Sequence, residues 1–136
     1  MKYLLDSNTC IRHLNRRSQP IIRRLSELSA ADIAVCSVVK AELYYGAAKS
    51  NNPVQTLATQ QEFLRQFVSL PFDDTAAEIY GRERARLEQL GTPIGPNDLL
   101  IASIALANGL VLVTHNTPEF KRVSNLQMED WEMGEQ

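Results

Sequence analysis

Short apolar runs alternate along this chain with longer amphipathic segments. The runs at residues 2–5, 33–36 and 110–113 are rich in Leu, Ile and Val, which predicts buried β-strands. The longer segments repeat apolar residues at helical spacing, which predicts α-helices over residues 21–28, 38–48, 54–68, 75–91 and 99–107. A further short helix carries Ile11 and Leu14.

The strand runs are apolar almost throughout, which is typical of parallel strands covered on both faces. Strands that alternate with helices indicate a three-layer α/β/α fold with a mostly parallel central sheet. The 136 residues suffice for a single domain, which we place at residues 1–136. Weaker signals predict a strand or extended link at residues 70–72, a single helical turn at 118–120 and an edge strand at 126–128.

Capping residues predict where the helices begin. Asn97, which follows Pro96, is the expected N-cap of the last long helix. Ser37 is the expected N-cap of the helix over residues 38–48. The capping-box pattern at residues 75–78 predicts another helix start, and residues 7–9 offer N-cap candidates for the first helix.

The helix over residues 75–91 shows a clear division between its two sides. Ile79, Leu87 and Leu90 fall on the apolar side. The charged residues are expected to point outward, and they are Arg82, Glu83, Arg84, Arg86 and Glu88.

Polar residues gather where the expected strands end. Asp6 follows the first strand, Asn116 lies just beyond the last one, and Asp98 begins a helix that is otherwise apolar. In open α/β sheets, ligands bind beyond the carboxyl ends of the strands. Glu42 shares a helix face with Val38 and Tyr45 by the i, i+4, i+7 rule, so we expect it to point inward with its apolar neighbours.

Three acids, Asp6, Glu42 and Asp98, are therefore expected near one another. Each alone is explained as a helix cap or as half of an ion pair. Carboxylates packed together repel one another and require a cation, and Mg²⁺ is the natural partner of a few carboxylate oxygens. The shared location of the three acids therefore favours a metal site over three separate structural roles.

Other catalytic arrangements find little support in the sequence. His13 and His115 have no Ser or Cys partner in a known motif, and the spacing of Gly91 and Gly95 lacks the Lys-Ser/Thr of a P-loop. Hydrolysis of a phosphodiester by a water that a metal ion activates is the route that remains.

Charge and composition limit which kinds of partner the protein can bind. A net charge of −2 argues against nucleic-acid binding through bulk charge. Between Ser7 and Ser26, however, there is no acid, and this stretch is either an RNA-binding patch or a solvated helical face; its arginines are Arg12, Arg16, Arg17, Arg23 and Arg24. Without a signal peptide or membrane span we expect a cytoplasmic protein in which Cys10 and Cys36 are ordinary reduced thiols.

Four short motifs occur in order along the chain. They are Asp6-Ser-Asn-Thr, the stretch Ser37 to Gly46 with Glu42 inside it, Ile94-Gly-Pro-Asn-Asp98 with the apolar run behind it, and Val113-Thr-His-Asn116-Thr-Pro-Glu119-Phe. In this order they resemble a PIN domain, and more narrowly the VapC toxins of bacterial toxin–antitoxin systems. The likeness covers nearly the whole chain, through Trp131.

This resemblance implies a function. It implies an endoribonuclease dependent on Mg²⁺ or Mn²⁺, a homodimer, and inhibition by a VapB-like antitoxin whose tail enters the active site. The segment from Thr114 to Phe120 resembles the subgroup that cuts tRNA, specifically initiator tRNA in the anticodon stem-loop.

The resemblance also implies roles for individual residues. Asp6 and Asp98 match the principal metal ligands of the family, Glu42 matches its third acid, and Thr114 its hydroxyl beside the site. Many PIN domains have an acid at the position of Asn116. An amide carries no charge, so Glu119, about one turn further on, is the candidate to compensate. We therefore expect one well-occupied metal and a second that binds mainly with RNA.

Two other functions stay open at this point. A phosphatase could use Asp6 as its nucleophile, but Asn8 stands where such enzymes have a second aspartate. A non-catalytic RNA-binding or partner-docking module would result if Asn116 has cost the site its metal.

Overall fold

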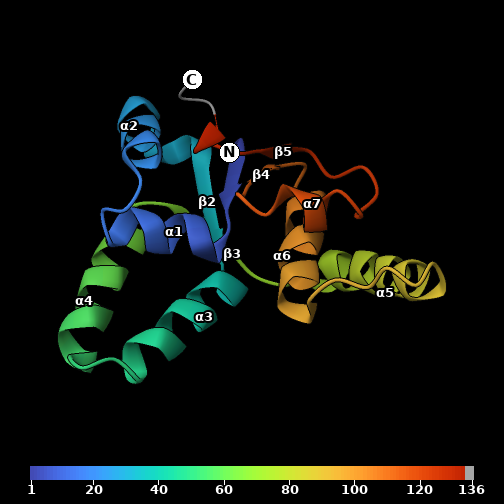
Figure 1. The fold of residues 1–136 in the computed structure, drawn as a ribbon, viewed down its shortest axis with the longest axis horizontal. Helices are drawn as coiled ribbons and strands as arrows, with labels where there is room; N and C mark the ends of the chain where they lie inside the picture. Colours follow the sequence, from blue (N-terminus) through green and yellow to red (C-terminus); the bar gives the residue numbers. More distant parts are fainter. Residues whose placement is uncertain (134–136) are drawn as a thin grey trace.

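The computed structural model describes residues 1–133 of the chain. Helices and strands alternate in the order that the apolar pattern predicts (Figure 1). The strands are β1 (Tyr3–Leu5), β2 (Ile33–Cys36), β3 (Val68–Leu70), β4 (Val111–Val113) and β5 (Met128–Glu129). The helices are α1 (Ser7–Leu14), α2 (Gln19–Glu27), the 3₁₀ turn η1 (Ala30–Asp32), α3 (Ser37–Ala48), α4 (Pro53–Leu64), α5 (Asp74–Gln89), α6 (Pro96–Ala107) and α7 (Thr117–Phe120).

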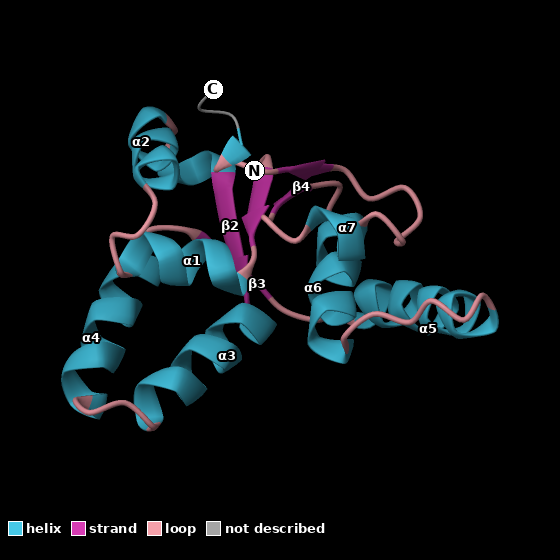
Figure 2. Cartoon of the chain, in the orientation of Figure 1, coloured by secondary structure: helices cyan, strands magenta, loops and turns pink. Residues whose placement is uncertain are grey.

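The five strands form one sheet in the order β3-β2-β1-β4-β5, and every neighbouring pair is parallel. Helices α1 to α4 lie on one side of the strands and α5 and α6 on the other (Figure 2). The expected three-layer α/β/α fold with a mostly parallel sheet is therefore confirmed. Apolar side chains fill both sides of the sheet, because the central strands are buried over their whole length.

The strand order explains why the carboxyl end of β1 is a natural site. From β1 the chain leads to β2 and β3 on one side, and it later returns to β4 and β5 on the other. Helices that follow neighbouring strands in opposite directions part at this point and leave a crevice. Asp6, the first residue after β1, lies at that crevice.

Helix α6 is the most deeply buried helix of residues 1–133. Six of its residues are buried, from Leu99 to Ala105, and it packs against α5. Gly109 then takes a positive φ of 63° just beyond the helix end, a conformation that a side chain disfavours. The burial of α6 fixes the position of its first turn, which carries Asp98.

The helix starts differ from the capping residues expected from sequence. The caps are Asp6 for α1, Cys36 for α3, Asp73 for α5 and Gly95 for α6. Asp6 and Asp73 accept a backbone N–H three residues on, whereas Cys36 and Gly95 cap without a side chain. Each of these helices therefore begins one to three residues earlier than expected, directly after the strand or turn that precedes it.

The end of α4 was also misplaced. The apolar pattern continues to Val68, but the helix ends at Leu64, and Val68 begins the strand β3 that pairs with Ala34. Pairing with β2 outweighs helical periodicity here, since the β-branched Val68 suits a strand. The edge strand expected at residues 126–128 is present as β5, two residues further on.

Two residues of α5 lie on the opposite side from the one expected. Leu90 is 62% exposed, whereas Glu83 is nearly buried. Glu83 accepts two hydrogen bonds from the Arg86 guanidinium, both 2.9 Å long, and one from the backbone N–H of Ser124. The bonds from Arg86 hold the pKa of Glu83 below its ordinary value against the opposing effect of burial. Through these hydrogen bonds, Glu83 connects α5 with the segment that follows α7 in the chain.

Two further expectations concern the chain as a whole. Cys10 and Cys36 are both free and buried. Among residues 1–133, no helix combines the length and the apolar character that a membrane crossing requires.

Candidate active site

Asp6 lies at the centre of the candidate site and caps α1. Its Oδ1 accepts the backbone N–H of Thr9 at 2.8 Å, and the hydroxyl of Thr114 also donates to its carboxylate. The residue is only 5% exposed. Burial raises the pKa of Asp6, against the hydrogen bonds from Thr114 and Thr9, and the charge of Glu42 raises it further.

Asp98, in the first turn of α6, faces Glu119 of α7. The two carboxyl groups share a hydrogen bond, and both lie against Gly95, where a Cβ would stand 3.6 Å from an oxygen of each. Burial, followed by the charges of Glu119, Glu42 and Asp6, raises the pKa of Asp98 to about 7. Of the two carboxyl groups, Asp98 is therefore the one that keeps its proton to the higher pH.

Glu119 stays ionised because backbone and amide groups hold it. Burial alone would raise its pKa, but Gly95 N–H donates to Oε1 at 2.9 Å and the Asn116 amide donates to Oε2 at 2.8 Å. Together with the bond from Asp98 these donors lower the pKa of Glu119. The amide of Asn116 thus positions the acid that the sequence offered as its replacement.

Glu42 reaches the site from α3 but not in the manner expected. The buried face of α3 carries Val39, Leu43 and Ala47, so the face that Glu42 shares with Tyr45 is not the core face. Tyr45 is 66% exposed, and the expectation that it packs inward is wrong. Val38, Glu42 and Tyr45 do share one face of α3, as the i, i+4, i+7 rule predicts. The rule does not show whether that face packs in the core or lines a groove, because both contain apolar side chains.

Thr114 connects the end of β4 with these acids. It is 1% exposed, and its Oγ1 accepts the backbone N–H of Asn116 at 3.0 Å. The Thr114 hydroxyl also donates to Asp6, so Thr114 fixes the conformation of the loop that follows β4. The structure therefore brings together all six candidate catalytic residues, which are Asp6, Glu42, Asp98, Thr114, Asn116 and Glu119.

The electrostatics of this acid cluster favour a cation. Within residues 1–133, none of Asp6, Glu42 and Asp98 forms a salt bridge with Lys or Arg. Their charges act on one another, as the raised pKa values of Asp6 and Asp98 show. The carboxylate groups of the cluster offer oxygen atoms as metal ligands, which suits a hard divalent ion such as Mg²⁺ or Mn²⁺. The residues present therefore fit the expected metal.

A second group of possible ligands includes His115, the residue after Thr114. His115, Asp130 and Glu132 place one ligand atom each within 4.8 Å of one another, the only such group of three in the described part of the chain. The acids of the candidate site are thus spaced more widely than this group. Asp130 already pairs with His115 at 2.8 Å, and Glu132 accepts from Arg12 at 2.6 Å. Both carboxylates of this second group therefore already have a partner, Asp130 in the His115 ring and Glu132 in the Arg12 guanidinium.

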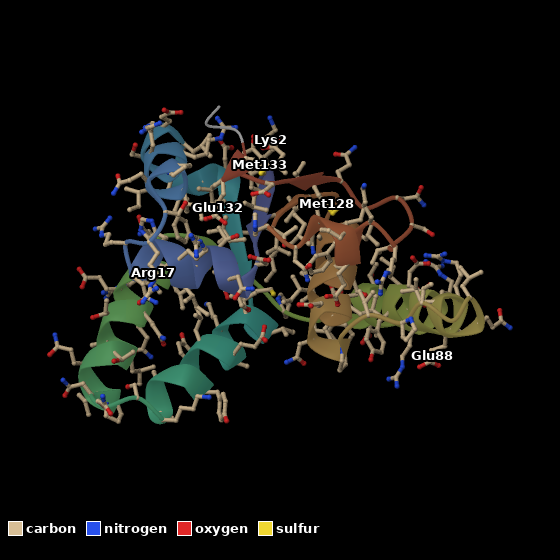
Figure 3. The ribbon with its side chains drawn as sticks, viewed as in Figure 1. Lys2, Arg17, Glu88, Met128, Glu132 and Met133 are labelled. Carbon is tan, nitrogen blue, oxygen red and sulfur yellow. The ribbon has the colours of Figure 1, made fainter. Side chains whose placement is uncertain are left out.

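Two of the five arginines expected to hold RNA make contacts with other side chains of the fold. Arg12 is half-buried against Glu132, and Arg24 lies over the rings of Tyr3 and Trp131. Tyr3 begins β1, whereas Asp6 follows its end. The other three are exposed on the surface of α1, α2 and the link between them; they are Arg16, Arg17 and Arg23, of which Arg17 is visible near α4 in Figure 3.

A groove of about 830 Å³ opens beside the acid cluster. Three helices form its walls, and Glu42 lies at its inner edge. The lining residues are Ser7, Asn8 and Ile11 of α1, Ser37, Val38, Ala41, Glu42, Tyr45, Gly46 and Lys49 of α3 or its C-cap, and Asn97 and Leu100 of α6.

Two contacts of the site were missed at the level of sequence. Ser7 donates its hydroxyl to Glu42 at 2.5 Å, although it was considered only as a cap. Its position directly after Asp6 was the available signal. The backbone N–H of Gly95 holds Glu119, and no residue type in the sequence indicates that contact.

Comparison with known proteins agrees with this fold. Residues 3–126 match the PIN domain family. The chain is 39% identical to the tRNA(fMet)-specific endonuclease VapC of Salmonella typhimurium (strain LT2), over 96% of this chain and 98% of that protein. It is 41% identical to ribonuclease VapC2 of Rickettsia felis, over 97% of this chain and 99% of that protein.

Among solved structures, the chain resembles the crystal structure of DNA-bound VapBC from Salmonella typhimurium. The TM-score is 0.91 at 38% identity, and the match covers 96% of this chain and 98% of that chain. Both kinds of likeness extend over nearly the full length, so they are not limited to one motif. The chain belongs to the PIN domain family and, within it, to the VapC proteins.

Proposed function

We propose that this protein is the toxin of a type II toxin–antitoxin pair and a metal-dependent endoribonuclease that cleaves tRNA. The observation that carries the proposal is the acid cluster, in which Asp6 and Asp98 have raised pKa values and no basic partner within residues 1–133. Such a cluster suits a divalent ion and a phosphate group. The full-length relatives named as ribonucleases support the reaction class.

Asp6, Asp98 and Glu42 are the residues that would hold the ion, which we propose to be Mg²⁺, with Mn²⁺ as a substitute. When bound, a divalent ion supplies a lower pKa for water and stabilises negative charge on the phosphate. Mg²⁺ binds through a few carboxylate oxygens and completes its shell with water and substrate oxygens, so three acids suffice for such a site.

The remaining side chains orient these ligands. Thr114 and the N–H of Thr9 fix the carboxylate of Asp6, and Ser7 fixes Glu42. Glu119 accepts a hydrogen bond from the protonated carboxyl group of Asp98 and so fixes its orientation. Asn116 contributes by holding Glu119 in place.

The substrate and partners follow from the same likenesses. One relative is named as specific for tRNA(fMet), and we propose initiator tRNA, cut in the anticodon stem-loop, as the substrate in the cytoplasm. The similar solved structure is a VapBC complex, so we propose inhibition by a VapB-like antitoxin. We further propose a homodimer that assembles with that antitoxin.

The test is incubation of purified total tRNA with the protein free of antitoxin. With Mg²⁺ we expect a small set of discrete fragments that carry 5′-phosphate and 3′-hydroxyl ends, and with excess EDTA we expect no cleavage. Sequencing of the fragment ends identifies the tRNA and the position of the cut. Intact tRNA under both conditions would contradict the proposal and favour a non-catalytic binding module.

A further inference from the structure

Tyr45 and Lys49 form an unusual pair on the wall of the groove. Tyr45 lies one turn beyond Glu42 on α3 and is 66% exposed, although its neighbours Leu43 and Ala47 are buried. The Lys49 ammonium lies over the ring, 4.6 Å from its centroid. An aromatic ring with a cation on one face, left open to solvent on the rim of a groove, is suited to a planar ligand with a negative charge beside it.

We propose that Tyr45 stacks on an unpaired base of the RNA substrate and that Lys49 contacts an adjacent phosphate. This inference rests on the proposed ribonuclease function. Bases of every kind stack on aromatic side chains, and lysines that track the backbone accompany such platforms. Tyr45 and Lys49 are then the residues that hold RNA next to the metal ligands.

The position of the groove supports RNA as its occupant. Glu42 is shared between the acid cluster and the groove, and Asn97, beside Asp98, lines the opposite wall. A phosphate at the acid cluster therefore has its neighbouring nucleotides in this groove. A volume of about 830 Å³ is within the range of small-ligand sites and has room for a nucleotide.

Lys49 also differs from two of the arginines of α1 and α2 because it lines the groove beside the acid cluster. The acid cluster repels phosphates unless a cation is near, and Lys49 is the basic residue that lines the groove. Arg12 and Arg24 are engaged with Glu132 and with Tyr3 and Trp131.

The test compares variants of Tyr45 in tRNA binding and cleavage. We expect Tyr45→Leu to weaken binding of labelled total tRNA by about tenfold or more, measured in the Asp98→Asn background to prevent cleavage. In the protein with Asp98 intact, Tyr45→Leu should raise KM with kcat nearly unchanged. Tyr45→Phe retains the ring and should remain within about twofold of wild type. Leu90→Ala, at a residue of similar exposure outside the groove, is the matched control.

Lys49 gives an independent readout through salt. Removal of one phosphate contact to a single strand lowers the slope of log K against log salt by about 0.7. We expect this change for Lys49→Ala and none for Lys2→Ala, since Lys2 also lies over a tyrosine ring but outside the groove, near the N-terminus in Figure 3. Equal salt slopes for Lys49→Ala and wild type would overturn the phosphate contact.

The remaining outcomes separate the two proposals. If wild type cleaves tRNA and Tyr45→Leu binds it equally well, the stacking role is wrong and the ribonuclease proposal stands. If Tyr45→Leu loses binding together with a change of mass in light scattering, the ring is a contact between copies of the chain, which also overturns the stacking role. If wild type neither binds nor cleaves tRNA, the proposed function itself fails.

Discussion

Replacement of Asp98 by Asn is expected to lower the rate of tRNA cleavage on the order of 10²- to 10³-fold, because it removes a charge that stabilises the reacting centre. Asn keeps the shape of the side chain and the first turn of α6. The rate is measured with Mg²⁺ on total tRNA. The matched control is Asp74→Asn, an exposed acid in the first turn of α5, which should cleave at the wild-type rate.

The same substitution should stabilise the fold in EDTA. The pKa of Asp98 is about 7 in the folded chain and near 3.8 when unfolded, so the folded state binds more protons between these values. The stability that the protonated form confers is present below pH 3.8 and is lost as the pH rises through 7. At pH 8, Asp98→Asn should therefore unfold with a free energy higher by on the order of 1 kcal/mol after solvent screening. A variant that is both inactive and less stable would indicate a merely structural Asp98.

The affinity for Mg²⁺ should depend strongly on pH. Asp98 must lose its proton to bind a cation, and its pKa of about 7 makes this a competition below neutral pH. We expect the apparent Kd to fall by up to about tenfold per pH unit between pH 5.5 and 7 and to level off above that. Calorimetric titration at several pH values measures this dependence.

Glu119→Gln provides the control for that pH dependence. After burial, the charge of Glu119 is the largest cause of the raised pKa of Asp98. The substitution should therefore move the plateau of Mg²⁺ affinity to lower pH. An affinity that is constant from pH 5.5 to 7.5 in wild type would contradict the competition between proton and metal at Asp98.

Much of the site follows from the sequence because it depends on strand ends. Asp6 and Asn116 follow buried apolar runs, and parallel strands bring such positions to one edge of the sheet. Asp98 stands out because it is the one acid of a helix that is otherwise apolar. The short motifs around these residues carried the resemblance to the PIN domain family that the comparisons then confirmed.

Other parts depend on tertiary contacts that no local pattern encodes. The presence of Tyr45 does not show which face of α3 packs into the core, because grooves and cores contain the same residue types. Glu83 was misplaced because its burial depends on the backbone of Ser124, a residue of a distant loop. The ion pairs of Arg12 and Arg24 with the C-terminal segment likewise depend on the fold, because their partners lie more than 100 residues away in sequence.

The central claim is that Asp6 and Asp98 hold one divalent ion, and calorimetric titration of Mg²⁺ at pH 8 tests it most directly. The titration compares wild type with Asp98→Asn and with His115→Ala, which disrupts the neighbouring group of possible ligands. We expect one site in wild type, the same site in His115→Ala, and no measurable binding in Asp98→Asn. Binding that survives in Asp98→Asn and disappears in His115→Ala would place the metal at His115 and contradict the account.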